Sequence, residues 1–140
     1  MKTNIIIFLL VSINSITLFS QAIEMNNPFS FSIKNSSIVI PDSVCKEIKY
    51  GKIYVHLIIN KEGKLIESTI LRLDLKSLTE NIQFFNESIL TDSSKNIPLK
   101  IAKYLPFVRN KIKYIRIHKN KYSQIHEKNY AVIPFSLVNK

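Results

Sequence analysis

The sequence predicts an α+β fold: a small antiparallel sheet of three or four strands with one or two helices packed on one face. Residues 53–72 alternate apolar and polar side chains on both sides of a turn that contains glycine, which is the pattern of a β-hairpin. Residues 77–90 and 97–105 carry apolar side chains at helical spacing, and residues 130–138 alternate again. Because an isolated hairpin is only marginally stable, other elements must cover and extend it.

The hairpin has the clearest pattern of these elements. Its turn, NKEGK, places Gly63 where a loop of three to five residues needs a positive φ angle. Successive side chains point to opposite faces of a strand, so the first strand has one face that is entirely aliphatic. We expect this face to be buried, and it consists of Ile53, Val55, Leu57 and Ile59.

A short helix is expected after the hairpin. Ser77 and Glu80 have the spacing of a capping box, in which side chains bond the free amide groups at a helix start. We interpret this helix either as a lid over the hairpin or as a surface helix. Its apolar stripe consists of Leu78, Ile82, Phe85 and Ile89.

A second helix is expected in the segment NIPLKIAKYLPFVR, with a stripe formed by Ile97, Ile101 and Leu105. Pro98 falls in its first turn, where the missing N–H group costs nothing. Proline disfavours helical geometry at the residue before it, so we expect Pro106 to end the helix and the chain to leave extended through Phe107 and Val108.

Two more extended segments are predicted towards the C-terminal end. Residues 111–119 alternate as a strand does, and residues 119–129 form a polar connection. The final strand, residues 130–138, is expected at a sheet edge, because Pro134 has no N–H group to give to a ladder. Its apolar face consists of Ala131, Ile133, Phe135 and Leu137.

Residues 1–22 are predicted to be a signal peptide, which would make the chain periplasmic or secreted. A short apolar run follows Lys2, and the small residues Ser20 and Ala22 stand at the −3 and −1 positions of a cleavage site. The alternative is an inner-membrane anchor through residues 5–19, a run shorter than the roughly 20 apolar residues of a spanning helix. Residues 23–48 are interpreted as an extended lead-in.

The cysteine content limits the disulfide chemistry of an exported chain. Cys45 is the only cysteine, so it cannot form an internal disulfide. We interpret it as a small half-buried residue, with pairing between two chains as the alternative.

Basic residues are concentrated in one segment of a chain whose formal net charge is +10. Residues 95–121 contain nine Lys or Arg and no acidic residue. Such a block is either a solvated face or a surface for an anionic partner, and export argues against nucleic acid as that partner. We assign to this basic surface Arg109, Lys111, Lys113, Arg116, Lys119 and Lys121.

No motif predicts catalysis. The sequence contains no glycine-rich phosphate loop, no metal-ligand cluster and no carboxylates paired at a useful spacing. His56, His118 and His126 are spread along the chain without a second ligand at helical or strand spacing. We therefore expect no enzyme activity, no metal and no cofactor.

Three stretches resemble the TonB C-terminal domain family. YGKIYVHLIINKEGKLIESTILR is similar to the opening hairpin of that family, with Gly51 and Gly63 where its glycines stand. IAKYLPFVR resembles the end of the family's helix, with Phe107 in place of the common Trp, and YAVIPFSLV resembles the terminal strand. The resemblance assigns residues 49–140 to one such domain, with an inserted helical segment near residues 73–96.

The resemblance implies a binding protein that acts in transport at the cell envelope. Members of the family engage outer-membrane receptors when a receptor peptide adds alongside the last strand, a form of β-augmentation. The partner would then be an envelope protein, although the long spacer needed for energy coupling is missing. The implied binding residues are Tyr130, Val132, Pro134, Ser136 and Val138.

The alternative function is that of a secreted cationic protein whose basic surface binds anionic lipid or polysaccharide. The two functions differ in salt sensitivity. Attraction between exposed charges is screened within about 8 to 10 Å at physiological ionic strength, whereas strand addition depends on main-chain hydrogen bonds.

Overall fold

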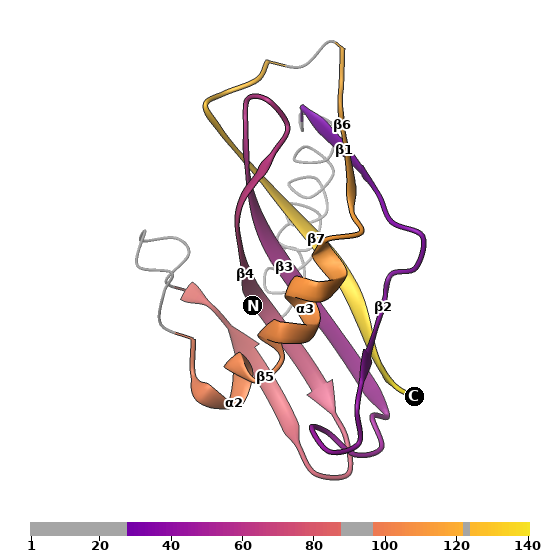
Figure 1. Ribbon diagram of the computed structural model, residues 1–140. Coiled ribbons are helices and arrows are strands. Elements are labelled where there is room, and N and C mark those ends of the chain that lie inside the picture. Colours follow the sequence, from indigo (N-terminus) through magenta and orange to yellow (C-terminus); the bar gives the residue numbers. More distant parts are fainter. Residues whose placement is uncertain (1–27, 88–96, 122–123) are drawn as a thin grey trace, which may run out of the picture.

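The computed structural model describes residues 28–87, 97–121 and 124–140, and it folds mainly as sheet (Figure 1). Strands make up 51% of the described residues and helices 13%. The expected α+β fold, a small sheet with one or two helices, is therefore wrong, because the helical part is one short bent segment and the strands form two sheets. The predicted signal peptide and the end of the predicted insertion, residues 88–96, lie outside the described residues.

The larger sheet has five strands in the order β2-β7-β3-β4-β5. All neighbours in it are antiparallel except β2, which runs parallel to β7. These strands are β2 (Ser37–Ile40), β3 (Tyr50–Asn60), β4 (Leu65–Lys76), β5 (Asn81–Phe85) and β7 (Lys128–Asn139). The smaller sheet pairs β1 (Phe29–Ser32) with β6 (Arg116–Lys119), so the expected lead-in contributes a strand to each sheet. The helical segment consists of α2 (Leu99–Ala102) and α3 (Leu105–Ile112).

The hairpin prediction is confirmed by β3 and β4, which pair along most of their length. Gly63 has a φ angle of +84°, as the turn requires. The side chain of Asn60 holds the turn closed, because its Oδ1 accepts the N–H groups of Glu62 at 3.1 Å and Lys64 at 2.9 Å. The two long strands therefore form one closed hairpin, with β3 as the central strand of the larger sheet.

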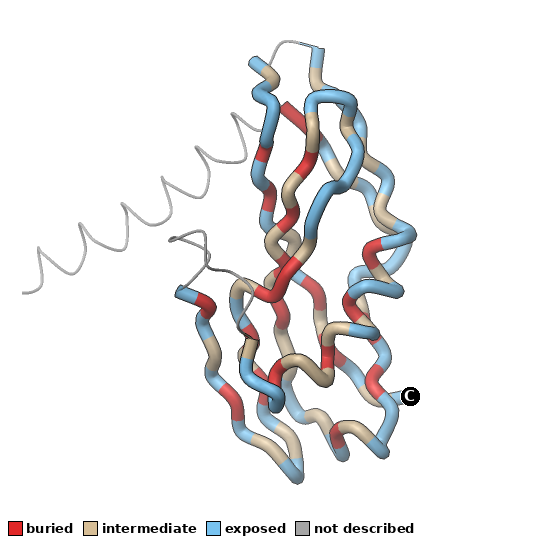
Figure 2. Tube along the Cα trace, turned by 60° about the vertical axis from the view of Figure 1, so that its left-hand side comes forward, coloured by how far each residue is buried: buried red, intermediate tan, exposed pale blue. Residues whose placement is uncertain are grey.

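The expected buried face of β3 is also confirmed, since its four aliphatic side chains are fully buried. They belong to one core with Ile101, Tyr104 and Val108 of the helical segment, which covers this face of the sheet (Figure 1). Figure 2 shows buried positions alternating along the strands with half-buried and exposed ones. On the opposite face of β3, Tyr50 is exposed and the remaining side chains are half-buried.

The expected helix over residues 77–90 is wrong, because residues 77–80 form a turn and residues 81–85 form strand β5. The Ser77 hydroxyl accepts the N–H groups of Thr79 at 3.2 Å and Glu80 at 2.9 Å, and the Ser77 N–H donates to the Glu80 carbonyl at 2.8 Å. These bonds close the turn between β4 and β5 instead of capping a helix. Ile82 is buried while Leu78 and Phe85 are exposed, so these three residues do not form the expected apolar stripe; its fourth member, Ile89, lies outside the described residues.

The expected end of the second helix is wrong as well. α2 stops at Ala102, and α3 begins at Leu105 with Pro106 in its first turn. In the first turn of a helix an N–H group has no hydrogen-bond partner within the helix, so a proline there removes no bond. Pro106 can therefore stand at the start of α3, just as Pro98 stands at the start of α2. Phe107 and Val108 are therefore helical, and α3 continues to Ile112.

The last strand is confirmed, but its edge position is not. β7 lies between β2 and β3, and of its expected apolar face Ala131, Phe135 and Leu137 are buried while Ile133 is half-buried. The predicted strand at residues 111–119 is shorter than expected, because α3 extends to Ile112 and β6 begins at Arg116.

The side chain of Asn139 joins the end of β7 to the region that follows β2. Its amide group donates to the carbonyl oxygens of Ile40 at 3.2 Å and Cys45 at 2.7 Å, and its oxygen accepts the N–H group of Ile48. These partners are 99, 94 and 91 residues away in the sequence. One asparagine thus fixes a loop that would otherwise have unpaired backbone groups.

Candidate functional site

The two halves of β7 differ in their pairing. Residues 136–139 pair with β2, and the Ser136 N–H donates to the Ser36 carbonyl at 3.0 Å. Ser136 and Val138 therefore belong to an interior part of the sheet, and their assignment to an edge is wrong.

The other half, residues 128–134, is hereafter the open half of β7. The N–H of Ser136 points away from β3, and backbone direction alternates along a strand, so the N–H groups of Lys128, Tyr130 and Val132 point the same way. Within the described residues, no strand pairs with this row. The open half is thus an edge that displays backbone donors and acceptors.

Pro134 stands in this outward row, opposite Tyr54 of β3. Its missing N–H group would have pointed away from β3, so the proline removes no bond from the β3 ladder. The sequence argument from proline to an edge is therefore correct for the open half, although it fails for the strand as a whole.

The start of the open half is held by Asn129. Its buried side chain donates to the carbonyl oxygens of Ile59 at 3.3 Å and His126 at 2.7 Å, and it accepts the His126 N–H at 3.0 Å. These bonds fix the strand against the end of β3. A partner would therefore meet an edge that is already ordered.

Aromatic and aliphatic side chains lie beside the open half, on the sheet face that the helices leave uncovered. Tyr130 is 57% exposed and Val132 is 44% exposed. The ring of Tyr130 stacks on His56, with 5.6 Å between centroids and 24° between planes. Burial lowers the pKa of His56, and the nearby Glu67 only partly opposes this, which favours the neutral form of the ring.

The predicted basic residues gather around the end of α3 and along β6. Arg109 and Lys111 lie in the last turn of α3, and Lys113 is its C-terminal cap. Arg116 and Lys119 are exposed on β6, and Lys121 follows the strand. No acidic residue interrupts this segment, so the positive charge is continuous in sequence.

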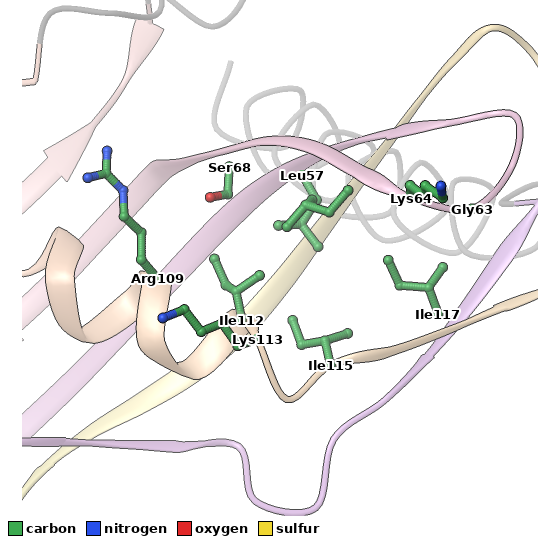
Figure 3. Close-up of a pocket in the computed structure, with 10 residues that line it drawn as sticks. Leu57, Gly63, Lys64, Ser68, Arg109, Ile112, Lys113, Ile115 and Ile117 are labelled. Carbon is green, nitrogen blue, oxygen red and sulfur yellow. The ribbon is translucent and has the colours of Figure 1, made fainter.

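Two of these basic residues, Arg109 and Lys113, line a cavity of about 440 Å³. It lies between the β3–β4 hairpin on one side and the end of α3 with the start of β6 on the other (Figure 3). Its aliphatic walls come from distant segments, namely Leu57, Leu65, Ile112, Ile115 and Ile117. Sequence reasoning missed this cavity, because no local pattern shows that the hairpin tip faces β6.

A second feature that sequence reasoning missed is a polar cluster below α2. The Glu80 carboxylate accepts hydrogen bonds from the Lys103 ammonium group and the Tyr104 hydroxyl, and Lys103 also donates to the Val44 carbonyl at 3.2 Å. Burial favours a higher pKa for Glu80, but the bonds from Lys103 and Tyr104 outweigh it and the pKa of Glu80 is lowered. Burial, followed by the bond to Glu80, raises the pKa of Tyr104.

Cys45 lies in the same cluster with only 1% of its surface exposed. It is therefore more buried than expected, and its thiol is not accessible for pairing with a second chain. The cluster ties the turn between β4 and β5 to the helical segment, which is a structural role.

In the described ranges, no group of three His, Cys, Asp or Glu side chains is arranged to hold a metal ion. No helix among the described residues has the length and apolar character that crossing a membrane requires.

No family model matches the sequence, and no curated protein or solved structure matches the chain.

Proposed function

We propose that the chain is an exported binding module of the cell envelope, which accepts an extended peptide of a partner protein as an added strand along the open half of β7. The observation that carries this proposal is the row of outward N–H and C=O groups at Lys128, Tyr130 and Val132, which no described strand pairs. Main-chain bonds would provide most of the affinity, and side chains next to Tyr130 would provide the selectivity.

The open half has two properties that suit strand addition. A strand added beside it would continue the line of β2 along β7, so it would lengthen an existing edge instead of creating a new one. The exposed side chains of Tyr130 and Val132 offer apolar contact to every second side chain of the peptide. The resemblance to the TonB C-terminal domain family agrees with this mode of binding and itself stays a prediction.

The second candidate function is binding of an anionic envelope surface, lipid or polysaccharide, by the basic surface. The observation in its favour is that none of Arg109, Lys113 and Arg116 takes part in an ion pair within the described residues. Exposed cations without neutralising partners attract polyanions over about one Debye length.

Substitution of Val132 by proline tests strand addition. The N–H group of Val132 faces away from β3, so Val132→Pro removes an outward donor and leaves the β3 ladder intact. Val132→Thr is the matched control, because it keeps the N–H group and the branched shape. Peptides selected on the purified chain from a random display library should bind Val132→Pro about tenfold more weakly than Val132→Thr.

Hydrogen exchange gives an independent measurement on the unaltered chain. A bound peptide should slow the exchange of the Tyr130 and Val132 amides, while the amide of Ser136, already bonded to Ser36, should change little. Equal binding by both Val132 variants would refute strand addition. If charge reversal at Lys111, Lys113 and Arg116 instead abolished binding in a salt-dependent way, the basic surface would be the site.

The proposal also requires export, which mass spectrometry of the exported chain tests. We expect a mature N-terminus after Ala22, since SQA ends the apolar run. An intact N-terminus would favour the membrane anchor through residues 5–19.

A further inference from the structure

The cavity between the hairpin and α3 has a deep apolar part. Leu57 is fully buried and Ile112 is 6% exposed, and the two come from opposite sides of the cavity. In Figure 3, Ile115 and Ile117 extend the same wall along the chain towards the hairpin tip. A volume of about 440 Å³ falls in the range of small-molecule sites.

The charged groups of the cavity are all cationic. Arg109 and Lys113 lie at one end, and Lys64 lies near the hairpin tip at the other (Figure 3). All three are exposed, and the ion pairs among the described residues involve other side chains. Among the described residues, no carboxylate lines the cavity, and Ser68 is the one neutral polar side chain in its lining.

We propose that this cavity binds a single-chain anionic amphiphile, with its acidic head at Arg109 and Lys113 and its hydrocarbon tail against Leu57, Ile112 and Ile115. The two cations would neutralise the head at the solvent-exposed end. The aliphatic walls would remove the tail from water, which gains free energy in proportion to the apolar area buried.

Competing ligand classes fit the lining less well. A sugar or a free nucleotide would leave many hydroxyl groups against aliphatic walls without partners, which is unfavourable. A small anion such as acetate would use the cations and leave the apolar part empty. The combination of two cations at one end with aliphatic side chains between them and Lys64 therefore selects a molecule that has both an acidic head and a tail.

Calorimetric titration of the purified chain with four probes separates head from tail. Dodecanoate and dodecyl phosphate carry both parts with different acidic heads, dodecanol carries only the tail, and acetate carries only the charge. We expect dodecanoate to bind at least tenfold more tightly than dodecanol, and acetate to give no measurable heat. Equal binding of dodecanoate and dodecanol would overturn the role of the cations. The ratio between dodecanoate and dodecyl phosphate identifies the preferred head.

Two double variants test whether the head binds at the cavity or anywhere on the basic surface. Arg109→Gln with Lys113→Gln should weaken dodecanoate binding about five- to tenfold, as loss of two exposed charge pairs does. Lys111→Gln with Lys121→Gln removes the same charge from residues that do not line this cavity. Equal weakening by both would overturn the cavity site in favour of diffuse attraction.

The tail is tested without any substitution by methyl NMR. Dodecanoate should shift the methyl signals of Ile112, Ile115 and Ile117, while those of Ile38 and Ile40, which do not line the cavity, should stay unchanged. Ser68→Phe, which fills the cavity, should abolish these shifts in a chain that still melts cooperatively. Binding to vesicles of phosphatidylglycerol without any methyl shift from monomeric dodecanoate would overturn the proposal and assign the cations to a membrane surface.

Discussion

The Tyr104 hydroxyl is expected to stabilise the fold mainly through its bond to Glu80, and Tyr104→Phe removes that bond together with the weaker contact of the hydroxyl with the Cys45 thiol. The ring of Tyr104 is fully buried, and the Glu80 side chain is 21% exposed. A hydrogen bond to a charged partner contributes about 1.5 to 3 kcal/mol, and the phenyl ring keeps its packing, so we expect a loss of about 2 kcal/mol in the free energy of unfolding. Urea denaturation at neutral pH measures this loss, and the slope of the free energy of unfolding against urea concentration should stay unchanged.

The pH dependence of this loss provides a second check. The pKa of Glu80 is lowered from 4.5 in the folded chain, so its stabilising contribution is complete above about pH 4.5 and is lost as the pH falls through the lowered pKa. The difference between wild type and Tyr104→Phe should therefore shrink in acid. Tyr114→Phe is the matched control, because Tyr114 is 67% exposed. Similar losses in Tyr104→Phe and Tyr114→Phe, or a difference that does not depend on pH, would refute the reasoning.

Four further substitutions have expected outcomes. Gly51→Ala should lower the free energy of unfolding by about 1 to 3 kcal/mol in urea denaturation, because a Cβ at this position would lie 2.7 Å from that of Leu137. No loss would mean that the strands separate easily. In the same assay Leu57→Ala should lower the free energy of unfolding by about 2 to 5 kcal/mol and Asn60→Ala by about 1 kcal/mol. Equal losses would contradict the packing described for Leu57. Burial lowers the pKa of His56 from 6.5 in the folded chain, so the unfolded chain binds a proton at a higher pH than the folded chain does. The free energy of unfolding therefore falls as the pH drops below about 6.5. His56→Asn should reduce that fall between about pH 7 and about pH 5, as measured by thermal melting.

The hairpin could be predicted from sequence because all its determinants are local. The alternation in β3 and the position of Gly63 specify both strands and the turn, and the structure has the same buried face. The alternation of the last strand was equally readable. The strands next to it could not be predicted, because strand order depends on segments far away in the sequence. One of these neighbours, β2, comes from residues that were interpreted as an extended lead-in.

The wrong predictions arose where one local sequence signal is compatible with two different structures. Ser77 bonds the amide of Glu80 in the manner expected of a capping box, but the same bonds also close a turn between antiparallel strands. Pro106 can end one helix or begin the next, and a bend after α2 decides between them. At the candidate site, Pro134 correctly indicated an unpaired row, but only the position of β2 limits that row to residues 128–134.

The bonds made by Asn139 have a consequence for how the chain folds. Contacts between residues 91 to 99 positions apart require closure of nearly the whole described chain before they form, and such topologies fold in milliseconds to seconds. The hairpin can form as soon as it is synthesised, whereas β2 must wait for the last strand to emerge. During translation β2 therefore stays unpaired until the last strand is present, and in that interval it is an exposed edge that can aggregate with other chains.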